Sequence, residues 1–403
     1  MNQSLMGAVR RVSSALRVRI PGLGASSPDC HKPDERNGGV RVEEAKREPF
    51  GFAEDASDWA PPPKDTRRST EDSPSPQKSL RETVRLLRDA NRHLEPRERL
   101  RNPEQRARKV PLDVPEGAGF HERSFSCDAG SRDYRLFVPS LVERPAQGLL
   151  VMLHGCTQTP EDFAAGTGMN ALAEAAGFIV AYPKQTGQHS AMQCWNWYRH
   201  GDQRRGAGEP AILAGLATSL MEEFDLPEGR SFAAGLSAGG AMAAVLAEAY
   251  SDVFAAVGIH SGVAPGTARD VISAFSAMRG EFYNGVHWRL QAEGAPAPRV
   301  IVFHGKADRM VNPANARRIV GAARGLHPEG RAMMETGTGP GDRGFERLLQ
   351  TSSDGTPLVE AWIVEGLGHA WSGGSPDASY TDAIGPDASR EMLRFFLGAR
   401  DVS

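Results

Sequence analysis

Short runs of apolar residues recur along the chain from about Phe120 onward, and each has the length of one β-strand. Six of them lie at residues 149–154, 178–182, 231–235, 255–259, 300–304 and 359–364. Apolar residues at helical spacing separate several runs, as at Ile212, Leu213, Leu216, Leu220 and Phe224. Because strands that alternate with helices form parallel sheets covered on both faces, the pattern predicts an α/β fold with a mostly parallel central sheet flanked by helices.

Two further strands are predicted before the first of these runs. Residues 123–127 and 134–138 are separated by Asp128-Ala129-Gly130-Ser131, which is typical of the turn in a β-hairpin. Two later segments, 265–298 and 323–357, are longer and less regular. We expect them to be insertions above the strand ends.

The first 115 residues have a different composition. They are rich in Arg, Glu, Asp, Pro and Ser, and they include Pro61-Pro62-Pro63 and Ser73-Pro74-Ser75-Pro76. Such a stretch buries too little apolar surface to offset the entropy lost on ordering. We therefore predict a polar, low-complexity, largely disordered extension over residues 1–115 and a folded domain over residues 116–400.

Within this extension, residues 1–20 have the pattern of a basic amphipathic helix. The apolar positions at helical spacing are Leu5, Val9, Val12, Leu16 and Ile20, and four arginines lie between them. The helix either docks on a membrane, a partner or a hydrophobic granule, or is a marginal helix or a targeting remnant. A second charged stretch, 78–108, predicts a solvated helix.

Charge and hydropathy exclude several classes of protein. The formal net charge of −3 gives no reason to expect a nucleic acid partner. No run of 18 or more apolar residues occurs, so no membrane-spanning helix is predicted. The N-terminus also lacks the apolar core of a secretory signal.

The four cysteines are Cys30, Cys127, Cys156 and Cys194. None forms a CxxC pair, so no zinc site is expected. The residues leave open whether Cys156 and Cys194 form a disulfide or stay reduced. No phosphate-binding loop, dinucleotide-binding glycine pattern or cluster of metal ligands is visible, and no cofactor is predicted.

Gly235-Leu236-Ser237-Ala238-Gly239 has the GxSxG pattern of a nucleophile elbow. It follows the predicted strand at 231–235 and precedes a helical run at 241–249. The elbow needs glycine on both sides because the turn from strand to helix is too tight for larger side chains. Since such a turn exposes the hydroxyl, Ser237 is the predicted nucleophile.

A serine nucleophile needs a base, and the base needs a third group to hold it. In this fold class the chain order is serine, acid, histidine. Asp308 follows the strand predicted at 300–304, and His369 follows the strand predicted at 359–364. Both lie at carboxyl ends of strands, where the elbow also emerges, so Asp308 is the predicted acid and His369 the predicted base.

Acyl transfer also needs hydrogen-bond donors for the developing oxyanion. His154-Gly155-Cys156 follows the strand at 149–154 and corresponds to the loop that supplies one backbone N–H in such folds. The N–H of Ala238, the residue after the nucleophile, supplies the other. Cys156 and Ala238 are therefore expected to act through their backbones, and no cysteine is assigned as a nucleophile.

Other histidines and aspartates are weaker candidates for the base and the acid. Three histidines end apolar runs, where a hydrogen-bonded structural role is more typical: His154, His260 and His304. Two aspartates lie after His369, and a third precedes the serine at a helix end: Asp382, Asp387 and Asp225.

Six segments carry a family resemblance: LHGCTQTPEDFAAGTGMNALAEAAGFIVAYPKQ at 153–185, CWNWY at 194–198, AGLSAGGAMAAVLAEAY at 234–250, FAAVGIHSG at 254–262, FHGKADRMVNPAN at 303–315 and GHAWSGGSPDASYTD at 368–382. In content and order they resemble the polyhydroxybutyrate (PHB) depolymerase family of esterases, which is related to feruloyl and acetylxylan esterases. The resemblance covers about residues 124–397. It implies an α/β-hydrolase fold, the triad Ser237, Asp308 and His369, and an oxyanion loop at Gly155 and Cys156.

The resemblance further implies a serine esterase that hydrolyses short-chain hydroxyacyl esters, namely poly(3-hydroxybutyrate) or its oligomers. A feruloyl or acetylxylan carboxylesterase is the alternative enzyme, and a non-catalytic binding protein with a hydrolase fold is the alternative outside catalysis. Trp371, Trp195 and Trp197 either line an acyl groove or close the core, and the nearness of Trp371 to His369 favours the site.

The chain departs from secreted polyester depolymerases in two respects. Such enzymes usually carry a signal peptide and an appended β-type substrate-binding domain, and neither is visible in this sequence. The sequence therefore leaves the location open between the extracellular region that is usual for the family and the cytoplasm.

Overall fold

The computed structural model describes residues 41–42, 112, 114–140, 145–190, 192–281 and 288–398. The helices predicted over residues 1–20 and 78–108 lie outside the described residues.

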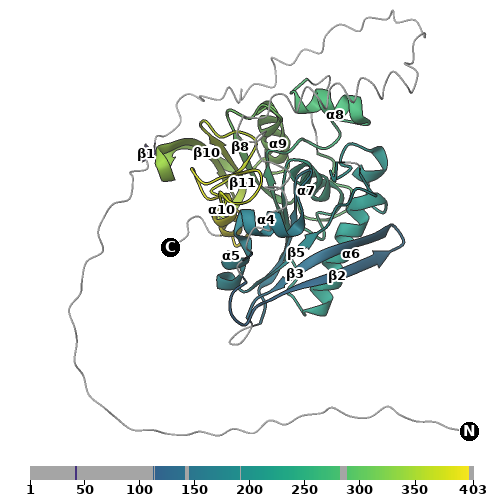
Figure 1. Cartoon of the computed structure of the whole chain (residues 1–403). Helices are drawn as coiled ribbons and strands as arrows, with labels where there is room; N and C mark the ends of the chain where they lie inside the picture. The colour runs from purple at the N-terminus through teal and green to yellow at the C-terminus, as the bar shows by residue number, and fades with distance from the viewer. Residues whose placement is uncertain are drawn as a thin grey trace, which may run out of the picture. The chain divides into compact units, whose positions relative to one another are not determined.

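One large sheet organises the domain (Figure 1). Its strand order is β1-β9-β10-β11-β8-β7-β6-β4-β5-β3-β2. The strands are β1 (Arg41–Val42), β2 (Gly119–Cys127), β3 (Gly130–Val138), β4 (Gly148–Leu153), β5 (Phe178–Pro183), β6 (Ser231–Leu236), β7 (Ala256–His260), β8 (Arg299–Gly305), β9 (Arg331–Gly339), β10 (Arg343–Thr351) and β11 (Pro357–Val364). A separate pair is formed by β12 (Trp371–Ser372) and β13 (Thr381–Asp382).

The centre of the sheet confirms the predicted parallel strands. The apolar runs correspond to β4, β5, β6, β7, β8 and β11, which pair in parallel. The predicted hairpin is β2 and β3, which pair antiparallel and attach to β5. Because β6, β8 and β11 run in one direction, the loops after them emerge at one edge of the sheet.

The segment 323–357 differs from the irregular insertion that the sequence predicted. It contains an antiparallel hairpin, β9 and β10, that extends the sheet beyond β11. Every residue of β9 is at least partly exposed. The strand is therefore defined by its pairing with β10 and not by burial.

Helices cover both faces of the sheet. They are α4 (Pro160–Thr167), α5 (Met169–Ala176), α6 (Gly208–Glu223), α7 (Ala238–Ala249), α8 (Val271–Met278), α9 (Ala314–Gly325) and α10 (Ala388–Phe396). Leu149 and Val151 of β4 join the core of α6, α7 and α9, whereas Leu150 and Met152 join the core of α4, α5 and α10. Alternate residues of one strand thus pack into two cores, which explains the continuous apolar runs.

Within the described segments, no helix has the length and apolar character needed to cross a bilayer.

Candidate active site

Ser237 lies in the turn between β6 and α7, and its backbone is strained. Its φ of 57° and ψ of −117° lie in a region that non-glycine residues rarely adopt. The neighbouring glycines make the turn possible. A Cβ on Gly239 would lie 2.0 Å from the carbonyl oxygen of Leu153, and one on Gly235 would lie 2.4 Å from the carbonyl carbon of Gly239. This geometry is that of the predicted nucleophile elbow.

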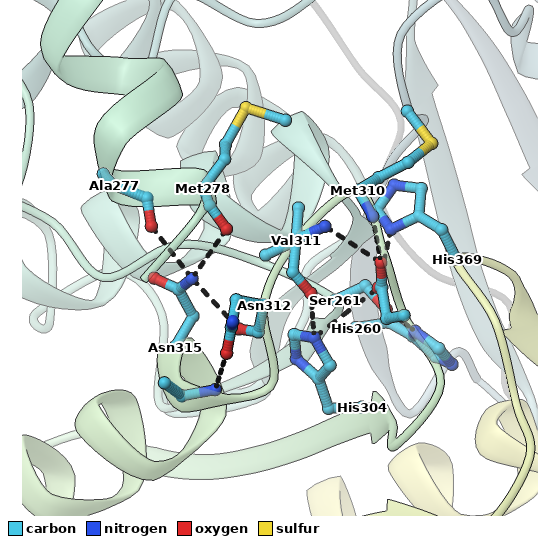
Figure 2. Close-up of polar contacts among 12 residues, drawn as sticks. His260, Ser261, Ala277, Met278, His304, Met310, Val311, Asn312, Asn315 and His369 are labelled. Carbon is cyan, nitrogen blue, oxygen red and sulfur yellow. Dashed lines mark hydrogen bonds and ion pairs between the residues drawn. The ribbon is translucent and has the colours of Figure 1, made fainter. Parts of the chain in front are cut away.

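Asp308 and His369 meet at the same edge of the sheet. Asp308 follows β8 and His369 follows β11, and the distance between Asp308 Oδ2 and His369 Nδ1 is 2.7 Å. The other carboxylate oxygen accepts the backbone N–H groups of Met310 and Val311, each at 2.9 Å. Figure 2 shows these two N–H groups and His369 around one carboxylate.

The environment of Asp308 keeps it ionised. Burial by itself would raise the pKa of this carboxyl group, but the charge and hydrogen bond of His369, with His304 and the Val311 N–H, bring it down to about 2. Because a carboxylate only accepts hydrogen bonds, His369 carries a proton on Nδ1, and Nε2 is the unprotonated nitrogen that can act as a base.

The loop that carries Asp308 is anchored to α8. The side-chain amide of Asn315 donates to the carbonyl oxygens of Ala277 and Asn312, each at 3.1 Å (Figure 2). Asn315 is fully buried, so these bonds are shielded from water. Helix α8 thus supports the loop that carries Asp308.

Two further histidines near the acid are neutral structural groups. His260 accepts the N–H of Ser372 at Nε2, 3.1 Å away, and burial lowers its pKa well below the ordinary value. His304 Nε2 lies 2.8 Å from the carbonyl oxygen of Val311 and 3.5 Å from Asp308 Oδ2. Burial also lowers the pKa of His304, so both rings are neutral, and each already makes a structural contact to the backbone.

The loop after β4 lies against Ser237, the predicted nucleophile. The position of a Cβ on Gly155 would be 3.7 Å from Ser237 Cβ. Cys156 forms a disulfide with Cys194, so the structure decides the question that the sequence left open. The Gly155 N–H donates to Gln158 Oε1 at 2.8 Å, which leaves Cys156 as the better donor candidate in this loop.

His154 fixes the start of this loop. It accepts the N–H of Gln185 at Nε2, 3.1 Å away, and its Nδ1 lies 2.8 Å from the Gly155 carbonyl oxygen. Burial lowers the pKa of His154 to about 4. The ring is therefore neutral, in agreement with the structural role that the sequence favoured.

The segment around Cys194 is held by a buried carboxylate at the start of α6. Glu209 accepts the backbone N–H of Asn196 at 2.7 Å and the guanidinium of Arg132 at 2.9 Å. Gln185 also donates to Glu209, at 2.5 Å. Since all four side chains are buried, this network connects the disulfide partner of Cys156 to the core.

The three tryptophans do not line an exposed groove, because all of them are buried. Trp371 is 1% exposed, packs against Phe163 and His260, and donates its indole N–H to Ser389. Its assignment to the substrate surface is therefore corrected, because a fully buried ring offers no face to a ligand. Trp195 and Trp197 are also buried and belong to the core, the alternative that the sequence left open.

The competing aspartates have other partners. Asp387 caps α10 by accepting the N–H of Arg390, and Asp382 pairs with Arg343 at 3.1 Å. Asp225 lies at a positive φ of 48° directly after α6. Neither of the contacts of Asp387 and Asp382 involves His369.

Tyr380 is a site residue that sequence reasoning missed. Its ring meets the His369 imidazole edge-on, with 6.5 Å between centroids, and its hydroxyl lies 3.5 Å from Thr157 Oγ1. Tyr380 lies inside the GHAWSGGSPDASYTD segment, but no spacing rule connects it to His369. Its place within that segment is the only sequence feature that pointed to Tyr380.

Positive φ angles concentrate around the site. Seven non-glycine residues of the described segments have them, and five of these lie in or beside the site: Thr157, Gln193, Ser237, Ser261 and Tyr380. Strained backbone persists only where surrounding contacts over-determine it, and it clusters at functional sites. Among the described residues, no group of three or more His, Cys, Asp or Glu side chains could hold a metal ion.

Comparisons with known proteins show that this chain is similar to esterases. Residues 132–328 match the family model described as Esterase PHB depolymerase. Poly(3-hydroxyalkanoate) depolymerase C of Paucimonas lemoignei is 32% identical over 253 residues, which cover 61% of this chain and 60% of that protein. Feruloyl esterase B of Neurospora crassa is 26% identical over 66% of this chain and 87% of its own length.

A solved structure establishes the fold class. The acetyl xylan esterase from Aspergillus awamori superposes with a TM-score of 0.55 at 18% sequence identity, and the match covers 70% of this chain and all of that one. The domain therefore has the α/β-hydrolase fold that the sequence predicted.

Proposed function

We propose that this chain is a serine esterase of the family described as Esterase PHB depolymerase, whose model matches residues 132–328, and that it acts through Ser237, His369 and Asp308. The observation that carries the proposal is the 2.7 Å hydrogen bond between Asp308 and His369, at the sheet edge where the strained Ser237 also emerges. The relatives named above as a depolymerase and an esterase support the same reaction class.

In the proposed reaction, Ser237 Oγ attacks the ester carbonyl carbon while His369 Nε2 takes the hydroxyl proton. Asp308 holds the proton on Nδ1 and stabilises the imidazolium that forms. The N–H groups of Cys156 and Ala238 bind the oxyanion. His369 then protonates the departing alcohol, and a water molecule, activated by the same imidazole, hydrolyses the acyl-enzyme.

The proposed substrate is a short-chain hydroxyacyl ester, either poly(3-hydroxybutyrate) or its soluble oligomers. The name of the Paucimonas lemoignei relative supports this choice. The matched region spans 60% of that relative's length, so the choice between polymer and oligomer is left to experiment.

A feruloyl-type carboxylesterase is the second candidate. The Neurospora crassa relative favours it, since the match covers 87% of that protein. Rates on feruloyl, acetyl and 3-hydroxybutyryl esters, measured side by side, separate the candidates. A preference of ten-fold or more for the feruloyl ester would replace the hydroxyacyl proposal.

The first test compares wild type with Ser237→Ala on emulsified poly(3-hydroxybutyrate) and on p-nitrophenyl butyrate. We expect turnover of both substrates by the wild type and a loss of about a thousand-fold or more in the variant, because the nucleophile is removed. The variant should unfold at the same temperature as the wild type. Full activity in Ser237→Ala, or no labelling of the wild type by a serine-directed phosphonate, would favour a non-catalytic binding protein.

A further inference from the structure

Tyr380 lies between the proposed base and the proposed oxyanion loop. Its ring touches the His369 imidazole edge-on, and its hydroxyl reaches Thr157, the residue after Cys156. A group that touches both sides of the reaction centre forms a wall beside the scissile ester. Tyr380 is partly exposed, whereas Trp371, Trp195 and Trp197 are buried.

The backbone of Tyr380 is strained. Its φ is 52°, a conformation that an aromatic residue rarely adopts. Its carbonyl oxygen accepts the Trp371 N–H at 2.7 Å, and the N–H of the preceding Ser379 donates to Asp162 at 3.1 Å. Contacts on both sides thus hold Tyr380 in a backbone conformation that it would not adopt without them, which is typical of functional positions.

The same contacts join Tyr380 to the oxyanion loop. Gln158 is 2% exposed, accepts the Gly155 N–H through its side-chain oxygen at 2.8 Å, and donates to the Ser379 carbonyl oxygen at 3.0 Å. One buried amide therefore fixes the loop beside Ser237 and the residue before Tyr380 relative to each other. The distance between the phenol and the oxyanion donors is set by this bridge.

The phenol hydroxyl is available to a ligand. Its contact with Thr157 Oγ1, at 3.5 Å, is at the outer limit of a hydrogen bond and therefore weak. A neutral hydroxyl beside an aromatic ring suits an uncharged carbonyl oxygen on an apolar chain. Every unit of a linear hydroxyacyl oligomer except the carboxyl-terminal one carries an ester carbonyl, so in a trimer a second ester carbonyl accompanies the scissile one.

We propose that Tyr380 is a substrate-binding residue whose hydroxyl donates a hydrogen bond to the second ester carbonyl of a hydroxyacyl oligomer. This inference rests on the proposed esterase function and deepens it, because it gives the site a preference for oligomers over simple esters. The contact is made beside the scissile bond, not at it, so it acts mainly on binding of the substrate.

The test compares wild type, Tyr380→Phe and Tyr182→Phe on the linear trimer of 3-hydroxybutyrate and on p-nitrophenyl butyrate. Tyr380→Phe keeps the ring and removes only the hydroxyl. We expect the ratio of kcat/KM on the trimer to kcat/KM on the aryl ester to fall about five-fold, mainly through a higher KM for the trimer. Tyr182 is the matched control, since its buried hydroxyl donates to Asn170 in the core, and its variant should keep the wild-type ratio.

An unchanged ratio in a Tyr380→Phe protein that unfolds at the wild-type temperature would overturn the inference and leave the esterase proposal intact. The same holds if the wild type cleaves the aryl ester but not the trimer. If the wild type cleaves neither substrate, the esterase proposal fails and the inference fails with it.

Discussion

At the scale of single residues, the site combines strained backbone with histidines whose protons are assigned by their neighbours. Ser237 and Tyr380 have positive φ angles, and buried partners hold both. His154 and His260 each accept a backbone N–H at Nε2, so they are fixed as neutral rings. His369 is different, because its Nδ1 faces the carboxylate of Asp308, which assigns the proton to that nitrogen.

The carboxylate of Asp308 provides a prediction at this scale. Asp308→Asn should lower kcat on p-nitrophenyl butyrate by about a thousand-fold or more, because an amide no longer holds the His369 proton on Nδ1. The matched control is Asp387→Asn. Asp387 caps α10, and we expect that variant to cost about 1 kcal/mol or less in unfolding free energy and to keep its activity. Comparable kcat values for the two variants would remove Asp308 from the triad.

At the scale of elements, the strands with continuous apolar runs were predictable and the exposed hairpin was not. Because β4 through β8 and β11 are buried on both faces, each has a continuous apolar run that can be recognised in the sequence of that strand alone. By contrast, β9 depends on its pairing with β10, which involves residues on both sides of a turn. The pattern of apolar and polar residues within one strand does not show such pairing.

The disulfide between Cys156 and Cys194 gives a prediction at the scale of elements. It connects the loop after β4 to a segment that Glu209 holds against α6. Replacing both cysteines by serine should lower kcat by about ten-fold, because the Cys156 N–H loses part of its alignment with the oxyanion. It should also lower the unfolding free energy by about 3–4 kcal/mol, given the sequence separation of 38 residues.

Urea unfolding and steady-state kinetics measure these two effects. The matched control is Cys127→Ser, since Cys127 is a free, exposed cysteine. The control should behave as the wild type. Retention of full kcat in the double variant would show that the loop keeps its position without the bond, and would contradict this prediction.

At the scale of the whole molecule, buried neutral histidines make stability depend on pH. Burial lowers the pKa of His154 to about 4, and it also lowers the pKa of His260 and of His304. In the unfolded chain these rings take up protons near pH 6.5, whereas in the folded protein they do not. The unfolded state therefore binds more protons in acid, and stability falls as the pH decreases.

We expect the unfolding free energy to decrease between about pH 6.5 and pH 4, with about 3 kcal/mol from His154 alone. Asp308 does not contribute to the change in this pH range. Its pKa is lower in the folded protein than in the unfolded chain, so its contribution to the unfolding free energy is lost only below the ordinary pKa of aspartate. Urea unfolding at several pH values measures the slope, and His154→Gln should make it shallower. A free energy that stays constant over this range would contradict the assignment of neutral buried rings.

The sequence by itself determined the α/β fold and the central parallel strands, and it predicted the elbow at Ser237 and the choice of Asp308 and His369 from their order in the chain. These features depend on local apolar runs and on residues close together in the chain. The tertiary structure alone decided the bond between Cys156 and Cys194, the burial of Trp371 and the place of Tyr380 between two loops. Each of these depends on which distant segments pack together, and packing in three dimensions leaves no periodic trace in the chain.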